Sequence, residues 1–192
     1  MTWDSYFMEI AKTVSINSKC QSRKIGAVIV TQDNRLVSSG YNGAPSHIDP
    51  CYTKVFPITA PDGHKMLIIP EGSDIKSYET NGRYREDRRD VVLNEHSECP
   101  RYVAGYRSGQ GMQYCPAQHA EENCVHTAAL LGVATRGTKM YCYCPTPCVH
   151  CCGAIINAGI VEVVCASLKE YQDEVSSLEM FKQAGVKVRL AE

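Results

Sequence analysis

His119-Ala120-Glu121 and Pro147-Cys148-Val149-His150-Cys151 are the two stretches that decide how this chain folds. Each stretch opens a segment in which apolar residues recur at helical spacing, over 120–131 and 148–158. Cys148 and Cys151 are three residues apart, so on one turn of a helix their sulfur atoms face the same way. One imidazole and two thiolates are the ligands of a zinc ion whose fourth position stays open to water, which is typical of a catalytic site. The sequence therefore predicts a zinc site held between two helix starts, with His119, Cys148 and Cys151 as its ligands.

Glu121 lies two residues after the predicted histidine ligand, close enough to move protons at the open position without binding the metal. Zinc lowers the pKa of bound water to about 7, and a carboxylate beside it can take that proton and pass it to a nucleobase. The pattern H-x-E…P-C-x-x-C is the signature of zinc-dependent nucleobase deaminases. P-C-x-x-C alone also occurs in structural zinc ribbons, but the two motifs in this order favour a hydrolytic deaminase with Glu121 as the catalytic residue.

The segments around these motifs alternate between strand and helix patterns. Continuous apolar or alternating runs predict strands, the first two forming a hairpin, and the spacing of apolar residues predicts helices between them. This order indicates an α/β fold of three layers, α-β-α, with a central five-stranded mixed sheet flanked by helices. The expected strands are 26–30, 35–39, 139–144, 160–166 and 186–190, and the expected helices are 5–18, 120–131, 148–158 and 178–184.

Composition bounds the class of protein. A chain of 192 residues with 44% hydrophobic and 21% charged residues is typical of one soluble globular domain, 1–192. No apolar run approaches the roughly 20 residues of a membrane span, and Met1-Thr2-Trp3-Asp4 lacks the pattern of a signal peptide. We therefore expect a cytoplasmic protein that does not contact membranes, in the host cytoplasm if its source is viral.

The number of cysteines and the net charge limit which ligands and partners the protein is expected to bind. The 11 cysteines are an odd number without an export signal, which favours metal ligands over disulfides. A formal net charge of −1 argues against a nucleic-acid partner, which usually requires a clear basic excess. A small anionic substrate needs only a local basic pocket.

Residues from about 46 to 118 differ from the rest of the chain. They are rich in proline, glycine and charge and show no sustained period, so we expect an irregular insertion on the domain surface. Lys65 to Ile69 is either a short strand or a buried strip. Arg83, Arg85, Arg88 and Arg89 are interleaved with acidic residues, which favours a solvated face over a phosphate or effector site.

The motifs together resemble the cytidine deaminase superfamily and, within it, the deoxycytidylate (dCMP) deaminase family, including its phage and microbial members. The resemblance covers 18–30, the loop Gly40-Tyr41-Asn42-Gly43-Ala44-Pro45, the stretch 119–123 and the Pro147 to Cys151 motif. Taken alone, the loop is a strand-ending turn whose glycines permit backbone close to a ligand. Other nucleobase deaminases share the zinc motif but not this loop, which makes it the most discriminating feature.

The resemblance implies a reaction, a substrate and a regulation. The reaction is hydrolysis of dCMP to dUMP and ammonia, which feeds dTTP synthesis. By the same resemblance, Asn42 contacts the sugar or base, Arg23 and Lys24 meet the 5′-phosphate, and Tyr171 contacts the substrate. Family members are typically hexamers that dCTP activates and dTTP inhibits, with Mg²⁺ accompanying the triphosphate.

A second, structural zinc is also implied by the resemblance, with Cys20, Cys51, His96 and Cys115 as its ligands. The fourth ligand has two candidates, because Cys115 lies four residues before His119 and Cys99 lies three residues after His96. We favour Cys115. Unrelated free thiols are the alternative reading of these cysteines.

Three other functions compete with dCMP deamination. A deaminase of dCTP or of a C5-modified dCMP uses the same chemistry in a different pocket. A deaminase of cytosine or adenine within nucleic acid needs a basic, aromatic groove, which the charge does not favour. A catalytically inert nucleotide sensor is disfavoured by the complete set of Glu121 and three ligands.

Overall fold

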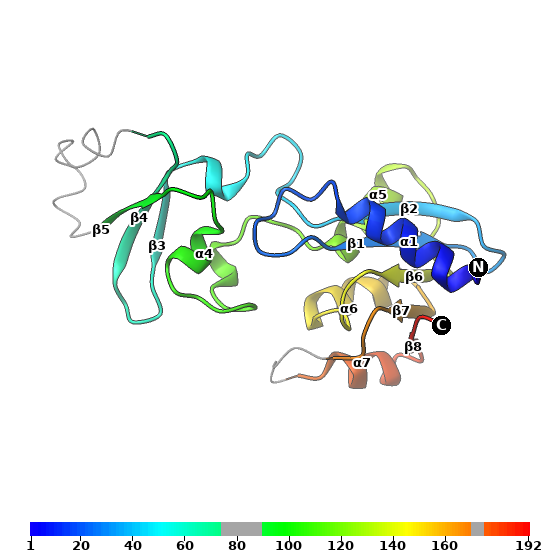
Figure 1. The fold of residues 1–192 in the computed structure, drawn as a ribbon. Helices are drawn as coiled ribbons and strands as arrows, with labels where there is room; N and C mark the ends of the chain where they lie inside the picture. Colours follow the sequence, from blue (N-terminus) through cyan, green and yellow to red (C-terminus); the bar gives the residue numbers. More distant parts are fainter. Residues whose placement is uncertain (74–89, 170–174) are drawn as a thin grey trace. The chain divides into compact units, whose positions relative to one another are not determined.

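The computed structural model describes residues 1–73, 90–169 and 175–192, which form two compact units (Figure 1). The first unit comprises Met1–Lys19, Lys24–Gly43 and Gln118–Glu192, and the second comprises Cys20–Arg23 and Ala44–Ala117. Both zinc motifs therefore belong to the first unit.

A five-stranded mixed sheet forms the centre of the first unit, as the sequence predicts. Its strands lie in the order β2-β1-β6-β7-β8. Strand β1 pairs antiparallel with β2 and with β6, and the pairs β6–β7 and β7–β8 are parallel. The strands are β1 (Gly26–Val30), β2 (Leu36–Tyr41), β6 (Lys139–Cys142), β7 (Glu162–Cys165) and β8 (Lys187–Leu190).

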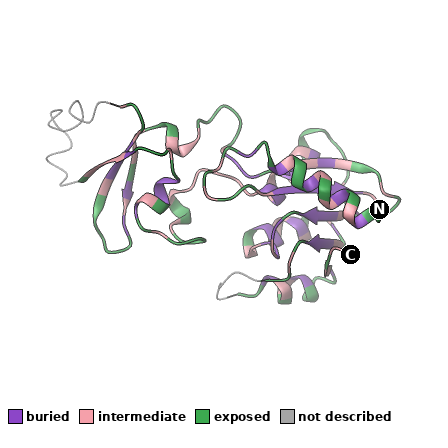
Figure 2. Ribbon diagram, viewed as in Figure 1, coloured by how far each residue is buried: buried purple, intermediate pink, exposed green. Residues whose placement is uncertain are grey.

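Helices cover both faces of this sheet, so the predicted three-layer fold is confirmed. Helix α1 (Trp3–Ser15) buries Phe7 and Ala11 against Val28, Tyr141 and Val164 on one face. The alternate residues of the same strands face the other way and pack with α5 (Ala120–Leu130), α6 (Val149–Asn157) and α7 (Ser177–Gln183). Figure 2 shows the inner strands β1, β6 and β7 almost entirely buried, as expected for apolar strands covered on both faces.

The loop after β2 is fastened to the start of α5. Gly43 N donates to Gln118 O at 3.1 Å, and Gln118 N donates to Gly43 O at 2.8 Å. Within β2, a side chain on Gly40 would place its Cβ 2.3 Å from Cys124 N, so the missing side chain lets the strand lie directly against α5. We expected the glycines of this loop to bring backbone close to a ligand; at Gly40 the close neighbour is instead the helix that carries Glu121.

Asp4, near the start of α1, ties both ends of the chain to the sheet. Its carboxylate accepts hydrogen bonds from Arg189 of β8, from Tyr141 Oη at 2.9 Å and from Glu192 N at 3.2 Å. Arg189 Nε also donates to Glu162 Oε1 at 2.7 Å. These contacts, the bonds from Arg189 above all, lower the pKa of Asp4 to about 2 although burial opposes them.

The second unit contains a three-stranded sheet in the order β3-β4-β5. Strand β3 (Phe56–Thr59) pairs antiparallel with β4 (Lys65–Pro70), and β5 (Asp90–Asn94) pairs with β4 in parallel. Ile58, Ile68 and Ala104 form its buried cluster, with α4 (Pro100–Val103) at one side. Two short 3-10 helices, η1 (Cys51–Thr53) and η2 (Met112–Tyr114), lie before β3 and after α4.

This sheet corrects one expectation, because the segment around 46–118 is not irregular throughout. Lys65 to Ile69 is a strand. The sheet is hard to predict from the sequence because its strands are short, β3 contains Pro57, and β5 pairs with a strand more than twenty residues away. The arginine cluster Arg83, Arg85, Arg88 and Arg89 lies outside the described residues.

Among residues 1–73, 90–169 and 175–192, no helix is both long enough and apolar enough to cross a membrane.

Candidate active site

His119, Cys148 and Cys151 meet in the first unit, where the sequence places them. Their donor atoms all lie within 4.8 Å of one another, and among the described residues they are the one His/Cys/Asp/Glu group that meets this condition. His119 Nδ1 lies 3.3 Å from Cys151 Sγ and 3.4 Å from Cys148 Sγ. A tetrahedral zinc with normal bond lengths separates nitrogen and sulfur ligands by roughly 3.6 Å. The three side chains therefore fit a zinc ion with little movement.

Two helix starts position these ligands. His119 is the N-cap of α5, and Glu122 Oε2 accepts from its backbone N–H at 3.5 Å. Cys148 is the N-cap of α6, and Cys151 lies in the first turn. Because a helix N-terminus carries partial positive charge, it favours the thiolate form that a metal requires.

Hydrogen bonds among His119, Cys148 and Cys151 shift the pKa values of all three side chains. Bonds from Cys151 and then from His119 lower the pKa of Cys148 to about 4, although burial opposes them. The bond to Cys148 raises the pKa of His119 to about 9. Cys151, which donates to Cys148 and is buried, has a pKa raised above its usual value. These bonds favour the thiolate form of Cys148, which is the form that binds a metal.

Glu121 lies in the first turn of α5 and is only 4% exposed. Burial raises the pKa of its carboxyl group above the usual value. Its Oε1 accepts a hydrogen bond from Cys144 Sγ at 3.6 Å. A buried carboxyl beside a metal-ligating group can both accept and return protons, as the sequence predicts for this residue.

The predicted substrate contacts lie in different parts of the chain. Asn42 is buried in the first unit, where its Oδ1 accepts from Ile25 N at 2.8 Å and its carbonyl accepts from Ser18 Oγ at 2.7 Å. Lys24 is exposed and donates to Ile16 O at 3.5 Å. Arg23 belongs to the second unit and donates to Ser108 Oγ at 2.6 Å. Tyr171 lies outside the described residues, so the substrate role of all four residues stays a prediction.

A group of thiols also forms in the second unit. A hydrogen bond to Cys99 raises the pKa of Cys51, followed by burial and by the charges of Cys99, Cys115 and Cys20. The same bond lowers the pKa of Cys99 to about 5, with help from backbone N–H groups at the start of α4. The structure thus groups Cys20, Cys51 and Cys115 with Cys99.

His96 is not among the residues that these interactions connect. Its side chain is exposed, and Cys99 is the residue that bonds to Cys51. The four thiols are spaced more widely than the ligands of the first site, since no three of them come within 4.8 Å of one another. The ligand set Cys20, Cys51, His96 and Cys115 stays a prediction, and Cys99 is the further thiol that the structure brings to this group.

Sequence reasoning missed the contact of Cys144 with Glu121. Cys144 lies two residues beyond Cys142 in an alternating run, so its position indicates only that it faces the core. Nothing in that pattern identifies the carboxylate of α5 as its partner, because the two residues are brought together only by the packing of α5 on the sheet.

Three comparisons place the chain among known proteins. Residues 1–167 match the family model described as the cytidine and deoxycytidylate deaminase zinc-binding region. A deoxycytidylate deaminase of Enterobacteria phage T2 is 31% identical over 163 residues, covering 83% of this chain and 77% of the relative. A deoxycytidylate deaminase of Saccharomyces cerevisiae is 30% identical over 189 residues, covering 98% of this chain. The chain spans only 44% of the length of that yeast relative.

A solved structure supports the fold. The dCMP deaminase of cyanophage S-TIM5, in complex with dCMP and dUMP, aligns with a TM-score of 0.57 at 20% identity. The alignment covers 97% of this chain and 94% of the cyanophage chain. With the matched family model, the relatives and the His119, Cys148 and Cys151 group in agreement, the chain belongs to the cytidine and deoxycytidylate deaminase family.

Proposed function

We propose that this protein catalyses the zinc-dependent hydrolysis of dCMP to dUMP and ammonia. The observation that carries the proposal is the position of Glu121, a buried carboxyl two residues from His119 in a group that fits zinc. The names of the relatives support dCMP as the substrate, because they are deoxycytidylate deaminases of yeast and phage. The cyanophage structure that holds dCMP and dUMP supports the same substrate and product.

The reaction replaces the amine on cytosine C4 by oxygen. A bound zinc at His119, Cys148 and Cys151 would supply a water that loses its proton near neutral pH. Glu121 accepts that proton and delivers it to ring N3 while the water oxygen adds to C4. It then takes the second proton from the new hydroxyl on C4 and passes it to the amine, so that the C4–N bond breaks, ammonia leaves and the C4 carbonyl forms. The raised pKa of Glu121 suits these transfers, because a carboxylate with a raised pKa is a stronger base toward water than an ordinary one.

The nucleotide contacts follow from the family resemblance. Asn42 would bind the sugar or base, and Arg23, Lys24 and Tyr171 would contact the phosphate and the rest of the substrate. The structure supports a fixed position for Asn42, since its side-chain oxygen and its carbonyl are both hydrogen-bonded. Replacing Asn42 by Ala should raise KM for dCMP more than it lowers kcat.

We also propose a structural zinc held by Cys20, Cys51, Cys99 and Cys115. The thiolate of Cys99 is favoured by Cys51 and by backbone N–H groups, and the charge of the buried Arg101 acts in the same direction. Binding would draw the four sulfur atoms together around the ion, as in Cys₄ structural sites.

Zinc content tests this second site. Two zinc ions per chain are expected in the intact protein and one in Cys99→Ser, with His96→Ala retaining two. One zinc in the intact protein, or a loss in His96→Ala instead, contradicts the proposed ligand set.

Regulation and assembly follow from the resemblance as well. We propose activation by dCTP and inhibition by dTTP, each with Mg²⁺, in a homo-oligomer that we expect to be a hexamer. Sedimentation equilibrium gives the number of chains, and dCMP turnover with each triphosphate gives the regulation. A monomer whose rate neither nucleotide changes would contradict this part of the proposal.

The substrate is tested by offering one panel to the zinc-loaded protein. The panel contains cytidine, CMP, dCMP, dCTP, a C5-methylated dCMP and a cytosine-containing oligonucleotide, each followed by the loss of cytosine absorbance. Turnover with a clear preference for dCMP is the expected result. A preference for dCTP or for the C5-modified nucleotide would select the first alternative, and activity on the oligonucleotide alone would refute the proposal.

A further inference from the structure

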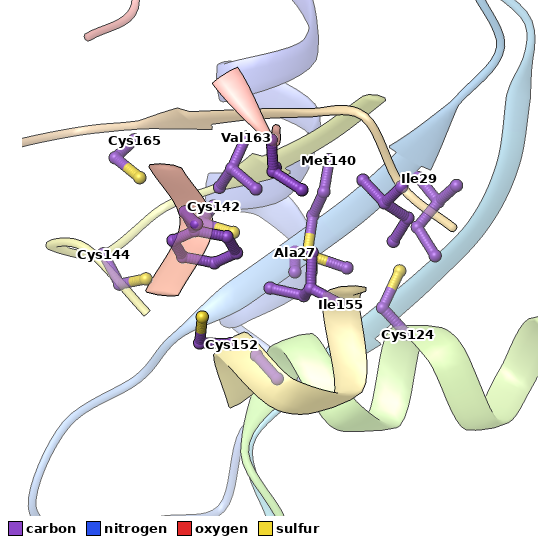
Figure 3. Packing of buried hydrophobic residues seen from close by; sticks show 14 residues of the cluster. Ala27, Ile29, Cys124, Met140, Cys142, Cys144, Cys152, Ile155, Val163 and Cys165 are labelled. Atoms are coloured by element: carbon purple, nitrogen blue, oxygen red, sulfur yellow. The ribbon is translucent and has the colours of Figure 1, made fainter. Parts of the chain in front are cut away.

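Two buried cysteines, Cys142 and Cys144, lie between the central sheet and the carboxylate of Glu121. Cys142 is the last residue of β6, and Cys144 follows in the loop that leads to Cys148. Both are buried, and the interaction with Cys144, followed by burial, raises the pKa of Cys142. Figure 3 shows the two residues in succession, with Cys165 on the neighbouring strand β7.

Cys144 contacts the candidate active site through Glu121. Its Sγ lies 3.6 Å from Glu121 Oε1, and both residues are almost fully buried, at 6% and 4% exposure. The thiol has a second acceptor, Pro145 O, at 3.0 Å. It carries a single proton, and the charged carboxylate is the stronger acceptor, because hydrogen bonds to an ionised group are about twice as strong as neutral ones.

The other buried thiols of the first unit have different partners. Cys124 contacts Ser38 Oγ at 3.3 Å, and Cys152 donates to Ser177 O at 3.6 Å. Cys165 pairs in register with Cys142 and is enclosed by the core. Within the described part of the chain, Cys144 is thus the thiol that bonds to the proposed proton carrier.

We propose that Cys144 is a positioning residue that holds one oxygen of Glu121, so that the carboxylate keeps a single orientation during proton transfer. A glutamate side chain has three rotatable bonds, and a buried one without a partner can turn away from the reacting atoms. An S–H group is a weak donor, which orients the carboxylate without strongly withdrawing its charge. This inference rests on the proposed function, since it assigns a role within that reaction.

Kinetics of three variants test the role. Cys144→Ala should lower kcat for dCMP about tenfold, the effect of losing one hydrogen bond to a charged group, with little change in KM or zinc content. Cys144→Ser should recover most of the rate, because a hydroxyl donates at the same place. Cys165→Ala is the matched control, since it removes a buried thiol of the same core while leaving the hydrogen bond from Cys144 to Glu121 in place, and should lower stability but not kcat.

The S–H stretching band of Cys144 gives a readout without turnover. The band is identified as the one missing from Cys144→Ala in infrared difference spectra. It should shift to higher frequency in Glu121→Gln, because a neutral amide oxygen accepts a weaker hydrogen bond than a carboxylate.

Two results would overturn the inference: an unmoved S–H band in Glu121→Gln, or equal loss of kcat in Cys144→Ala and Cys165→Ala without recovery in Cys144→Ser. If the S–H band shifts in Glu121→Gln but the wild-type protein turns over no nucleotide, the result counts against the proposed function and not against the hydrogen bond. The two failures are therefore distinguishable.

Discussion

Replacing Gly40 by Ala should displace the helix that carries His119 and Glu121. Gly40 has no positive φ, so alanine is compatible with its backbone and the effect is purely steric. The new Cβ would lie 2.3 Å from Cys124 N and 2.5 Å from Ala120 O, both backbone atoms of α5. Ordinary contacts begin at 3.4 Å, so the helix must withdraw by about 1 Å.

This displacement has two expected magnitudes. Overpacking of this kind costs about 1–3 kcal/mol of unfolding free energy. A shift of about 1 Å at catalytic groups lowers turnover by about a hundredfold. Urea unfolding measures the first quantity, and kcat for dCMP measures the second.

Gly43→Ala is the matched control for this prediction. A Cβ at Gly43 would meet only the Tyr41 ring, at 3.8 Å, and the position has no positive φ. Its stability should change by less than about 0.5 kcal/mol. If Gly40→Ala matched Gly43→Ala in stability and in kcat, the close packing of β2 on α5 would not be what positions Glu121.

Three further predictions concern the charge of Asp4 and the binding of zinc. Asp4→Asn should lower the free energy of unfolding by about 2 kcal/mol at pH 7. Because the pKa of Asp4 in the folded protein is lowered to about 2, this stabilisation is present above pH 4 and is lost as the pH falls toward 2. Denaturant titrations of both proteins between pH 2 and pH 7 would detect the loss. Zinc binding by His119, Cys148 and Cys151 at pH 7 should release about two protons from these ligands, since the pKa of His119 is raised to about 9 and that of Cys151 is raised as well, in addition to any that the bound water loses. The release should fall by about one proton as the pH passes 9, where His119 no longer carries a proton before zinc binds. Calorimetry in buffers of different ionisation enthalpy would show no such fall if this is wrong. Zinc at a hundred times its dissociation constant should stabilise the folded protein by about 2.7 kcal/mol, so chelation should lower the thermal midpoint, and an unchanged midpoint would contradict a built metal site.

Much of the first unit could be predicted from the sequence because its signals are local. The apolar run over 26–30 and the helical spacing after His119 each identify an element within a few residues. The grouping of His119, Cys148 and Cys151 could be predicted for the same reason, since His119 and the Cys148 to Cys151 motif each open a helix. Parallel strands joined by helices then leave few possible topologies.

The remaining features depend on contacts that are distant in sequence. Strand β5 is defined by pairing with β4, and Cys99 joins the second thiol group because α4 begins beside it. Cys144 meets Glu121 only when α5 packs on the sheet. The requirement for glycine at position 40 also depends on a distant contact, because a side chain there would meet the backbone of α5, about eighty residues further along the chain. No local pattern records such neighbours.

The central claim is that Glu121, beside a zinc held by His119, Cys148 and Cys151, deaminates dCMP. The most direct measurement is the rate at which dCMP is converted to dUMP and ammonia by wild-type and Glu121→Gln proteins of equal zinc content. We expect turnover by the wild-type protein that is lost on chelation and restored by zinc. In Glu121→Gln we expect the zinc to remain and the rate to fall by a factor of about 10² to 10⁴, the usual contribution of general acid–base catalysis. A Glu121→Gln protein that keeps its zinc and deaminates dCMP at the wild-type rate would contradict the account.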